Sequence, residues 1–397
     1  MQRKVGFEQT MTACYIGYIT QAIANVFAPL LFLTFSRQYG IALSKIALIS
    51  TINFAIQLTV DLAAAKFVDR IGYRPCMIAA HVSNVLGIAG LAVFPELLGD
   101  PFAGLLLAVF FYAVGGGLCE VLVSPIAGAC PTEKKDAQMS LLHSFYCWGV
   151  VAVVALSTLF FTLFGIENWK ILACLWAIVP LVNVFNFAVA PINKVVEDGR
   201  SMTIRELAGS GIFWLLALLM VCAGASEQAM SQWASAYTES ALRVSKTVGD
   251  LAGPCLFAIL MGGARMFYAK CSEKVDLRRF MVFSGALCIA CYLMASLSDS
   301  PLLGLLGCGL CGLSVGILWP GTFSVATVRC PRGGTAMFAL LALAGDAGCS
   351  LGPTLVNAVS GLAGGDLKAG MLAAVVFPLL LIVGLTALRR SKGGAAQ

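Results

Sequence analysis

The feature that most constrains this chain is a succession of twelve apolar runs, each long enough to cross a lipid bilayer as a helix. About 20 helical residues span the roughly 30 Å of bilayer hydrocarbon. The runs fall at about 11–36, 43–68, 75–95, 101–128, 138–165, 168–190, 209–238, 247–271, 278–298, 301–328, 333–361 and 368–388. In hydrocarbon only helices and closed barrels satisfy all backbone hydrogen bonds. These runs lack the short segments of alternating polar and apolar residues that barrel strands show. The sequence therefore predicts an all-α membrane protein with twelve transmembrane helices.

The composition favours the same class. Hydrophobic residues make up 59% of the 397-residue chain and charged residues 12%, where a soluble domain carries about 25% charged residues. The basic residues are scattered and form no patch with interleaved aromatics, so nucleic acid is not an expected partner. The fifteen cysteines lie mostly inside apolar runs, and we expect them to be small packing residues and not metal ligands. The lipid bilayer is the predicted environment.

The positions of lysine and arginine predict the orientation. If twelve spans leave both ends on one side, that side holds 19 of the 26 basic residues, the other side holds six, and Arg265 lies within a span. Basic residues concentrate on the cytoplasmic side of membrane proteins. We therefore expect a multi-pass protein of the cell inner membrane with both termini in the cytoplasm.

An internal repeat divides the chain. The longest interior polar stretch, 191–208, follows six runs and predicts a cytoplasmic linker between an N-terminal half, 1–190, and a C-terminal half, 209–397. Motifs recur in chain order: Ala65, Lys66, Asp69, Arg70 and Arg74 with Ala269, Lys270, Glu273, Lys274 and Arg278; Gly117 and Pro125 with Gly312 and Pro320; Cys130-Pro131 with Cys330-Pro331; Ser44-Lys45 with Ser245-Lys246. Six-helix halves in the same orientation imply a pseudo-two-fold axis along the membrane normal, a solute site between the halves and alternating access.

Four segments resemble those of known transporters. Asp69-Arg70-Ile71-Gly72-Tyr73-Arg74, between the second and third runs, resembles the signature loop of the major facilitator superfamily. Glu120 five residues before Pro125, Phe145 four residues before Gly149, and Glu227 with Trp233 resemble the fucose permease branch of proton-coupled sugar symporters. That resemblance implies proton-coupled sugar uptake. Two positions depart from the branch: Asn25 stands where an aspartate precedes Pro29 by four residues, and His143 replaces a glutamine.

Ionisable residues inside the runs are candidates for proton coupling, because burying a charge in the bilayer costs at least a few kcal/mol and such groups face the bundle interior. Glu120 is the leading candidate, and His143 in the next run titrates near neutral pH and could form a relay with it. Asp346 could be a second protonation site. The alternatives are a structural carboxyl group at Glu120 and a packed or hydrogen-bonding histidine at His143.

A wider set of polar and aromatic residues is expected to bind the solute, since amides, carboxylates and indoles suit hydroxyls and apolar sugar faces. These candidates are Gln21, Asn25, Glu120, His143, Tyr146, Glu227, Gln228, Ser231, Gln232, Trp233 and Trp319. For the amides the alternative is packing between helices. For the tryptophans it is anchoring at the membrane interface.

A third set is expected to gate the transporter. Asp61 and its repeat equivalent Arg265 are predicted to secure the cytoplasmic ends of the halves, and the loop residues Asp69, Arg70, Arg74 and Glu273 to form breakable charge pairs. Static packing is the alternative. His81, at the start of the third run, is expected at the interface with no role.

Together these features predict secondary active transport: proton-coupled uptake of a small polar solute, a monosaccharide or related polyol, by a monomer. No GxxxxGK[ST] sequence occurs, so ATP-driven transport is not expected, and no cofactor beyond the coupling proton is predicted. An alternative is a proton-antiport exporter of drugs or metabolites. A membrane-embedded sensor or enzyme is the alternative from another class, but no HExxH or GxSxG motif occurs.

Overall fold

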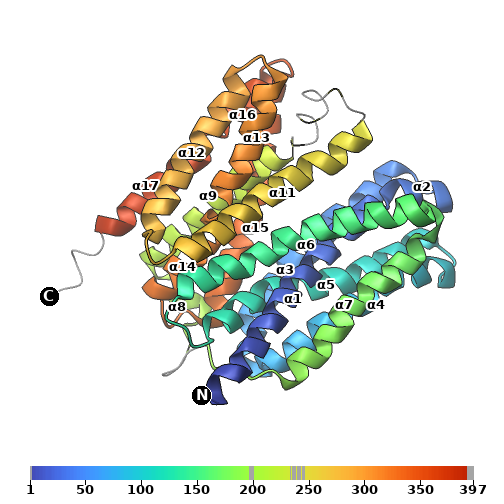
Figure 1. The fold of residues 1–397 in the computed structure, drawn as a ribbon, viewed down its shortest axis with the longest axis horizontal. Helices are drawn as coiled ribbons and strands as arrows, with labels where there is room; N and C mark the ends of the chain where they lie inside the picture. Colours follow the sequence, from blue (N-terminus) through green and yellow to red (C-terminus); the bar gives the residue numbers. More distant parts are fainter. Residues whose placement is uncertain are drawn as a thin grey trace. The chain divides into compact units, whose positions relative to one another are not determined.

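The structure is a computed structural model that describes residues 2–195, 201–232, 234, 238, 243 and 246–390. Its elements follow one another along the chain from blue to red in Figure 1. They are α1 (Gln2–Leu30), α2 (Phe32–Tyr39), α3 (Leu43–Ile71), α4 (Tyr73–Leu97), α5 (Pro101–Gly128), α6 (Lys135–Phe164), η1 (Ile166–Asn168), α7 (Trp169–Val189), α8 (Ile204–Ala208), α9 (Gly211–Ser231), α11 (Lys246–Cys271), α12 (Leu277–Leu297), α13 (Pro301–Val315), α14 (Leu318–Arg329), α15 (Gly334–Leu362), α16 (Leu367–Ala373) and α17 (Val376–Arg390).

The predicted twelve-span, all-helical fold is confirmed. Over the described residues, twelve segments are helical, long and apolar enough to cross a membrane, from Gly6–Leu30 to Leu367–Leu388. Large apolar side chains such as Leu163, Phe185 and Val189 are exposed along them. A soluble protein rarely exposes so much continuous apolar surface, whereas hydrocarbon solvates it.

Three runs that the sequence treats as single segments are divided in the structure, and one of them, the twelfth, separates into α16 and α17. The first ends as α1 at Leu30, just after Pro29, and continues as α2. The tenth is divided into α13 and α14 around Gly316 and Ile317, four and three residues before Pro320. Proline has no N–H, so it removes the helical bond to the carbonyl four residues earlier. For Pro320 that carbonyl belongs to Gly316.

Two compact units make up the chain. The first contains residues 1–131, 145–201 and 334–339, and the second contains 132–144, 202–333 and 340–397. The start of α6 thus packs within the second unit and the start of α15 within the first. The short helix α8 belongs to the second unit and begins with a capping box in which Thr203 and Glu206 bond reciprocally.

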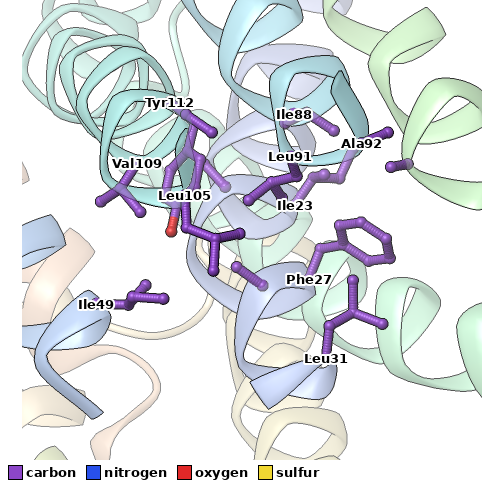
Figure 2. Close-up of a cluster of buried hydrophobic side chains, with 14 of the residues drawn as sticks. Ile23, Phe27, Leu31, Ile49, Ile88, Leu91, Ala92, Leu105, Val109 and Tyr112 are labelled. Carbon is purple, nitrogen blue, oxygen red and sulfur yellow. The ribbon is translucent and has the colours of Figure 1, made fainter. Parts of the chain in front are cut away.

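The core of the first unit is a cluster of apolar side chains where α1, α3, α4 and α5 meet. Figure 2 shows Phe27 of α1 and Leu31, which directly follows α1, in one cluster with Leu91 of α4 and Leu105 of α5, all at most 1% exposed. Lipid is as apolar as these side chains, so close packing holds membrane helices together more than hydrophobic burial does. Gly87 allows that approach, because a Cβ there would overlap the backbone of Tyr112.

An ion pair occurs at the same topological place in each unit. In the first unit Lys170, at the start of α7, pairs with Glu96 near the end of α4. In the second unit Lys368, at the start of α16, pairs with Asp299 just after α12. The two pairs join the third and sixth spans of their respective halves, which extends the sequence repeat to side-chain contacts.

Candidate solute and proton site

Glu120 forms the central contact of the first unit's polar interior. It lies on α5, is partly exposed, and its Oε2 accepts a hydrogen bond of 2.7 Å from Nε2 of Gln21 on α1. One turn along α5, Ser124 shares a 2.7 Å hydrogen bond with the Tyr18 hydroxyl, also from α1. The structure therefore brings two of the predicted site residues, Gln21 and Glu120, into direct contact.

Asn25 belongs to a second group one turn from Gln21 on α1. Its Oδ1 accepts hydrogen bonds from Gln57 Nε2 at 2.8 Å and from Asn53 Nδ2 at 3.3 Å, both on α3. Gln57 also donates to Asn53 Oδ1 at 3.1 Å. Asn53 and Gln57 lie four residues apart on one face of α3, and both bond the side-chain oxygen of Asn25.

His143 and Arg265 are joined in the second unit. Arg265, on α11 and 4% exposed, donates from Nη1 to the His143 carbonyl oxygen at 2.8 Å and from Nε to the Gly316 carbonyl oxygen at 2.7 Å. The latter carbonyl is the one that Pro320 leaves without a helical donor. In return Ser140 of α6 donates to the Arg265 carbonyl oxygen at 2.7 Å. The guanidinium thus occupies the break between α13 and α14.

Aromatic rings surround this histidine. The imidazole of His143 stacks on Phe323 of α14 with centroids 5.7 Å apart, and Trp319 meets Phe323 edge to face at 6.4 Å. Trp319 also fills the space beside Gly345 of α15, where any Cβ would overlap the indole. The predicted residues His143 and Trp319 therefore share Phe323 as a neighbour, and Asp346 follows Gly345, partly exposed.

The α9 candidates lie at the end of that helix. Glu227 is partly exposed and interacts electrostatically with Arg265, and Ser231 donates to Gln228 Oε1 at 3.3 Å. Gln232 is exposed at the helix end. Trp233 lies outside the described residues. Tyr146 is partly exposed on α6 and belongs to the first unit.

The gating candidates have diverse partners. Asp69 accepts from the Thr335 hydroxyl at 2.7 Å and from the Tyr73 hydroxyl at 3.2 Å. Arg74 instead bonds the end of α7, where it donates to the carbonyl oxygens of residues 187, 188 and 190. Thr335 was not singled out in the sequence, because a threonine at a helix start looks like an ordinary polar residue.

The remaining gating candidates are Glu273, Asp61, Arg265 and Arg70. Glu273 forms an exposed ion pair with Lys134, whose hydrogen bond and positive charge lower the pKa of the carboxyl group. Asp61 is fully buried in the first unit, whereas Arg265 belongs to the second. The predicted pairing of Asp61 with Arg265 stays a prediction, as does a gating role for Arg70, which is exposed in the last turn of α3.

The expectation for His81 is wrong. Its side chain is fully buried on α4, where Nδ1 bonds the Met77 carbonyl oxygen at 2.8 Å and Nε2 bonds Asn183 Nδ2 of α7 at 2.8 Å. Asn183 Nδ2 also donates to the Ala13 carbonyl oxygen of α1 at 2.9 Å. Position near the start of a run suggested the interface, but the bundle encloses this side chain and uses it to join three helices.

No group of three or more histidine, cysteine or acidic side chains is placed to hold a metal ion in the described part of the chain. The candidate residues themselves offer hydrogen-bond donors, hydrogen-bond acceptors and carboxyl groups that can carry a proton. A partly exposed carboxyl group with an amide donor can exchange a proton and bind a hydroxyl.

Comparisons with known proteins agree with this architecture. The profile of the Major Facilitator Superfamily matches residues 14–353. The multi-drug resistance efflux pump PmrA of Streptococcus pneumoniae is 23% identical over 378 residues, which cover 90% of this chain and 91% of PmrA.

Solved structures share the fold at low identity. FucP in its outward conformation matches with a TM-score of 0.80 at 14% identity, over 95% of this chain and 98% of FucP. The proton:xylose symporter XylE matches with a TM-score of 0.76 at 13% identity, over 96% and 94%. The human organic anion transporter TETRAN matches with a TM-score of 0.74 at 17% identity, over 95% and 99%. With the family profile extending over most of its length and twelve helices of the matching fold, this chain belongs to the major facilitator superfamily of membrane transporters.

Proposed function

We propose that this chain is a proton-coupled symporter that takes up a small polar solute, a monosaccharide or related polyol, by alternating access. It would lie in the cell inner membrane with both termini in the cytoplasm, as the distribution of basic residues indicates. The observation that carries the proposal is the Glu120 carboxyl group, partly exposed within a membrane span and bonded to Gln21 at 2.7 Å.

Proton coupling requires a group that gains and loses a proton during the transport cycle. An ionised carboxylate accepts hydrogen bonds only, whereas the protonated group also donates one. Glu120 can bind a solute hydroxyl differently in its two states, so solute and proton binding would be linked. The amides of Gln21 and Asn25 can bond hydroxyls without adding charge, which suits a neutral polyol.

Proteins with the same fold support proton-coupled sugar symport as the class of transport. Structures with the same fold include an E. coli fucose:proton symporter and a proton:xylose symporter. Asn25 cannot take up a proton, so in this proposal Glu120 carries the coupling proton and His143 and Asp346 are secondary candidates.

The test uses purified protein in liposomes with radiolabelled fucose and xylose as probes. Under an inward proton gradient, wild type should accumulate one of these sugars, and Glu120→Gln should abolish accumulation while exchange of internal for external sugar continues. Glu8→Gln, an exposed glutamate of α1, is the matched control and should behave as wild type. Full accumulation by Glu120→Gln would refute the coupling role, and no sugar transport by wild type would refute the substrate class.

A second candidate function is export by proton antiport, favoured by the similarity to PmrA over 90% of this chain. An exporter should expel a cationic dye from cells and load it into inverted vesicles when these are energised. Dye transport of this kind, without sugar accumulation in the liposome assay, would establish export in place of uptake.

A further inference from the structure

The three amides of Asn25, Asn53 and Gln57 form a closed hydrogen-bonded group, which we call the amide ring. Asn25 Oδ1 accepts from both α3 amides, at 2.8 Å from Gln57 and 3.3 Å from Asn53. Gln57 completes the ring by donating to Asn53 Oδ1 at 3.1 Å. A primary amide offers two N–H donors and one oxygen. Both Gln57 N–H groups are therefore engaged within the ring.

The ring fixes which end of the Asn25 amide is available. Its oxygen is occupied by two donors, so its Nδ2 group points away from the ring, and in the described part of the chain this group has no hydrogen-bond partner. Gln57 and Asn53 are 1% and 4% exposed, whereas Asn25 is partly exposed. The ring thus presents two oriented N–H donors from its only accessible member.

Helix α5 holds the ring in place. A Cβ at Gly116 would lie 3.3 Å from Gln57 Nε2, and one at Gly117 would lie 3.3 Å from the Gln57 Cα. Glycine at these positions lets α5 pack directly against Gln57. The same helix carries Glu120 one turn further on, so the donor-presenting Asn25 and the accepting carboxylate are built on one packed assembly of α1, α3 and α5.

We propose that Asn53 and Gln57 are positioning residues that aim the Asn25 N–H donors at the transported solute, which must present a hydrogen-bond acceptor there. This inference rests on the proposed function and deepens it. Gln21 and Asn25 are four residues apart, about 6 Å along one helix face, and Gln21 bonds Glu120. The solute would therefore meet N–H donors at Asn25 and a hydrogen-bond acceptor at Glu120, so it must carry both an acceptor and a donor group.

The discriminating variant is Asn25→Asp. An aspartate oxygen can still accept from Gln57 and Asn53, so the ring and the thermal stability should be kept, while the outward N–H donors are replaced by an acceptor. We expect solute affinity to fall about tenfold or more, the effect of losing one good hydrogen bond. Gln57→Leu should open the ring, raise the half-saturating concentration about tenfold and leave the maximal exchange rate unchanged. Gly263→Ala, at a helical glycine with open space around it, is the control.

The measurement is binding and exchange of fucose, xylose and their monodeoxy analogues by purified protein. For wild type, one deoxy analogue should bind about tenfold more weakly than its parent sugar. Asn25→Asp should bind this analogue with the same affinity as the parent sugar, because the substitution has already removed the contact that the deoxy group would remove. The affinities for glucosamine and glucuronate are measured in parallel, to show whether a positive or negative charge on the sugar changes binding.

The possible outcomes separate the two proposals. If wild type binds sugar and Glu120→Gln abolishes accumulation, but Asn25→Asp and Gln57→Leu bind as wild type does, the ring inference alone is overturned. It is also overturned if Asn25→Asp lowers the melting temperature as much as Gln57→Leu does. If wild type binds none of the sugars, the proposed function fails and the inference falls with it. The inference is overturned as well if Asn25→Asp keeps the wild-type affinity while Gln57→Leu loses affinity, because Gln57 would then have a purely structural role.

Discussion

The break between α13 and α14 allows a sharp test of why Arg265 is buried. Pro320 has no N–H, so the Gly316 carbonyl oxygen lacks its usual helical donor, and Arg265 Nε donates to it at 2.7 Å. Arg265→Met keeps most of the side-chain volume but removes this donor and the bond to the His143 carbonyl oxygen. The second unit should be destabilised.

The magnitude follows from the two bonds. A buried carbonyl left without a partner lowers the free energy of unfolding by about 1–3 kcal/mol, and hydrogen bonds from a charged donor are at the upper end of that range. For the two bonds together we expect a loss of about 2–4 kcal/mol. For a unit of this size 1 kcal/mol shifts the melting temperature by about 2–4 °C. Arg265→Met should therefore melt about 5–15 °C lower. Arg279→Ala, at an exposed arginine, should change little.

A second substitution isolates the cause. Gly316 and Ile317 have helical dihedral angles, with φ −51° and ψ −41° at Gly316, so Pro320→Ala supplies an N–H placed to bond the Gly316 carbonyl. Arg265→Met should then cost about 1–2 kcal/mol less in the Pro320→Ala background, measured as a coupling energy in thermal unfolding. Additive effects, or a wild-type melting temperature for Arg265→Met alone, would refute the explanation.

Three further predictions concern packing and charge. Gly345→Ala places a Cβ against the Trp319 indole, so it should destabilise the second unit by about 1–3 kcal/mol; thermal unfolding measures this, and Gly361→Ala, with open space around it, should have little effect. Arg74→Ala removes three bonds to carbonyl oxygens at the end of α7 and should lower the melting temperature, whereas Lys66→Ala should not. Lys134 lowers the pKa of Glu273, so their ion pair stabilises the fold above the ordinary carboxyl pKa and is lost as pH falls through the lowered value. A difference in melting temperature between Lys134→Ala and wild type at pH 7 should therefore vanish once the pH is below the lowered pKa of Glu273, and a difference that persists when the carboxyl group is protonated would contradict the assignment.

The candidate site was partly visible in the sequence. Glu120 and Gln21 stood out because polar groups within hydrocarbon-length runs are costly, and the structure joins them. Asn53 and Gln57 showed helical spacing, but a spacing cannot reveal which residue of another helix they bond. The sequence did not show the partners of Asp69 and Arg74 either, since a charged residue near the end of a span has many possible partners until the helices pack.

The class of fold follows from the sequence alone, because twelve apolar runs in a chain with 12% charged residues can only be stable as helices across a bilayer. Whether a segment is stable in lipid depends on its own length and hydrophobicity, so each span can be predicted from its own residues. The amide ring, the Arg265 bond to Gly316 and the enclosure of His81 were decided only by tertiary structure. Each depends on contacts between helices far apart in the chain, and in lipid those contacts come from close packing, which hydrophobicity along the sequence does not encode.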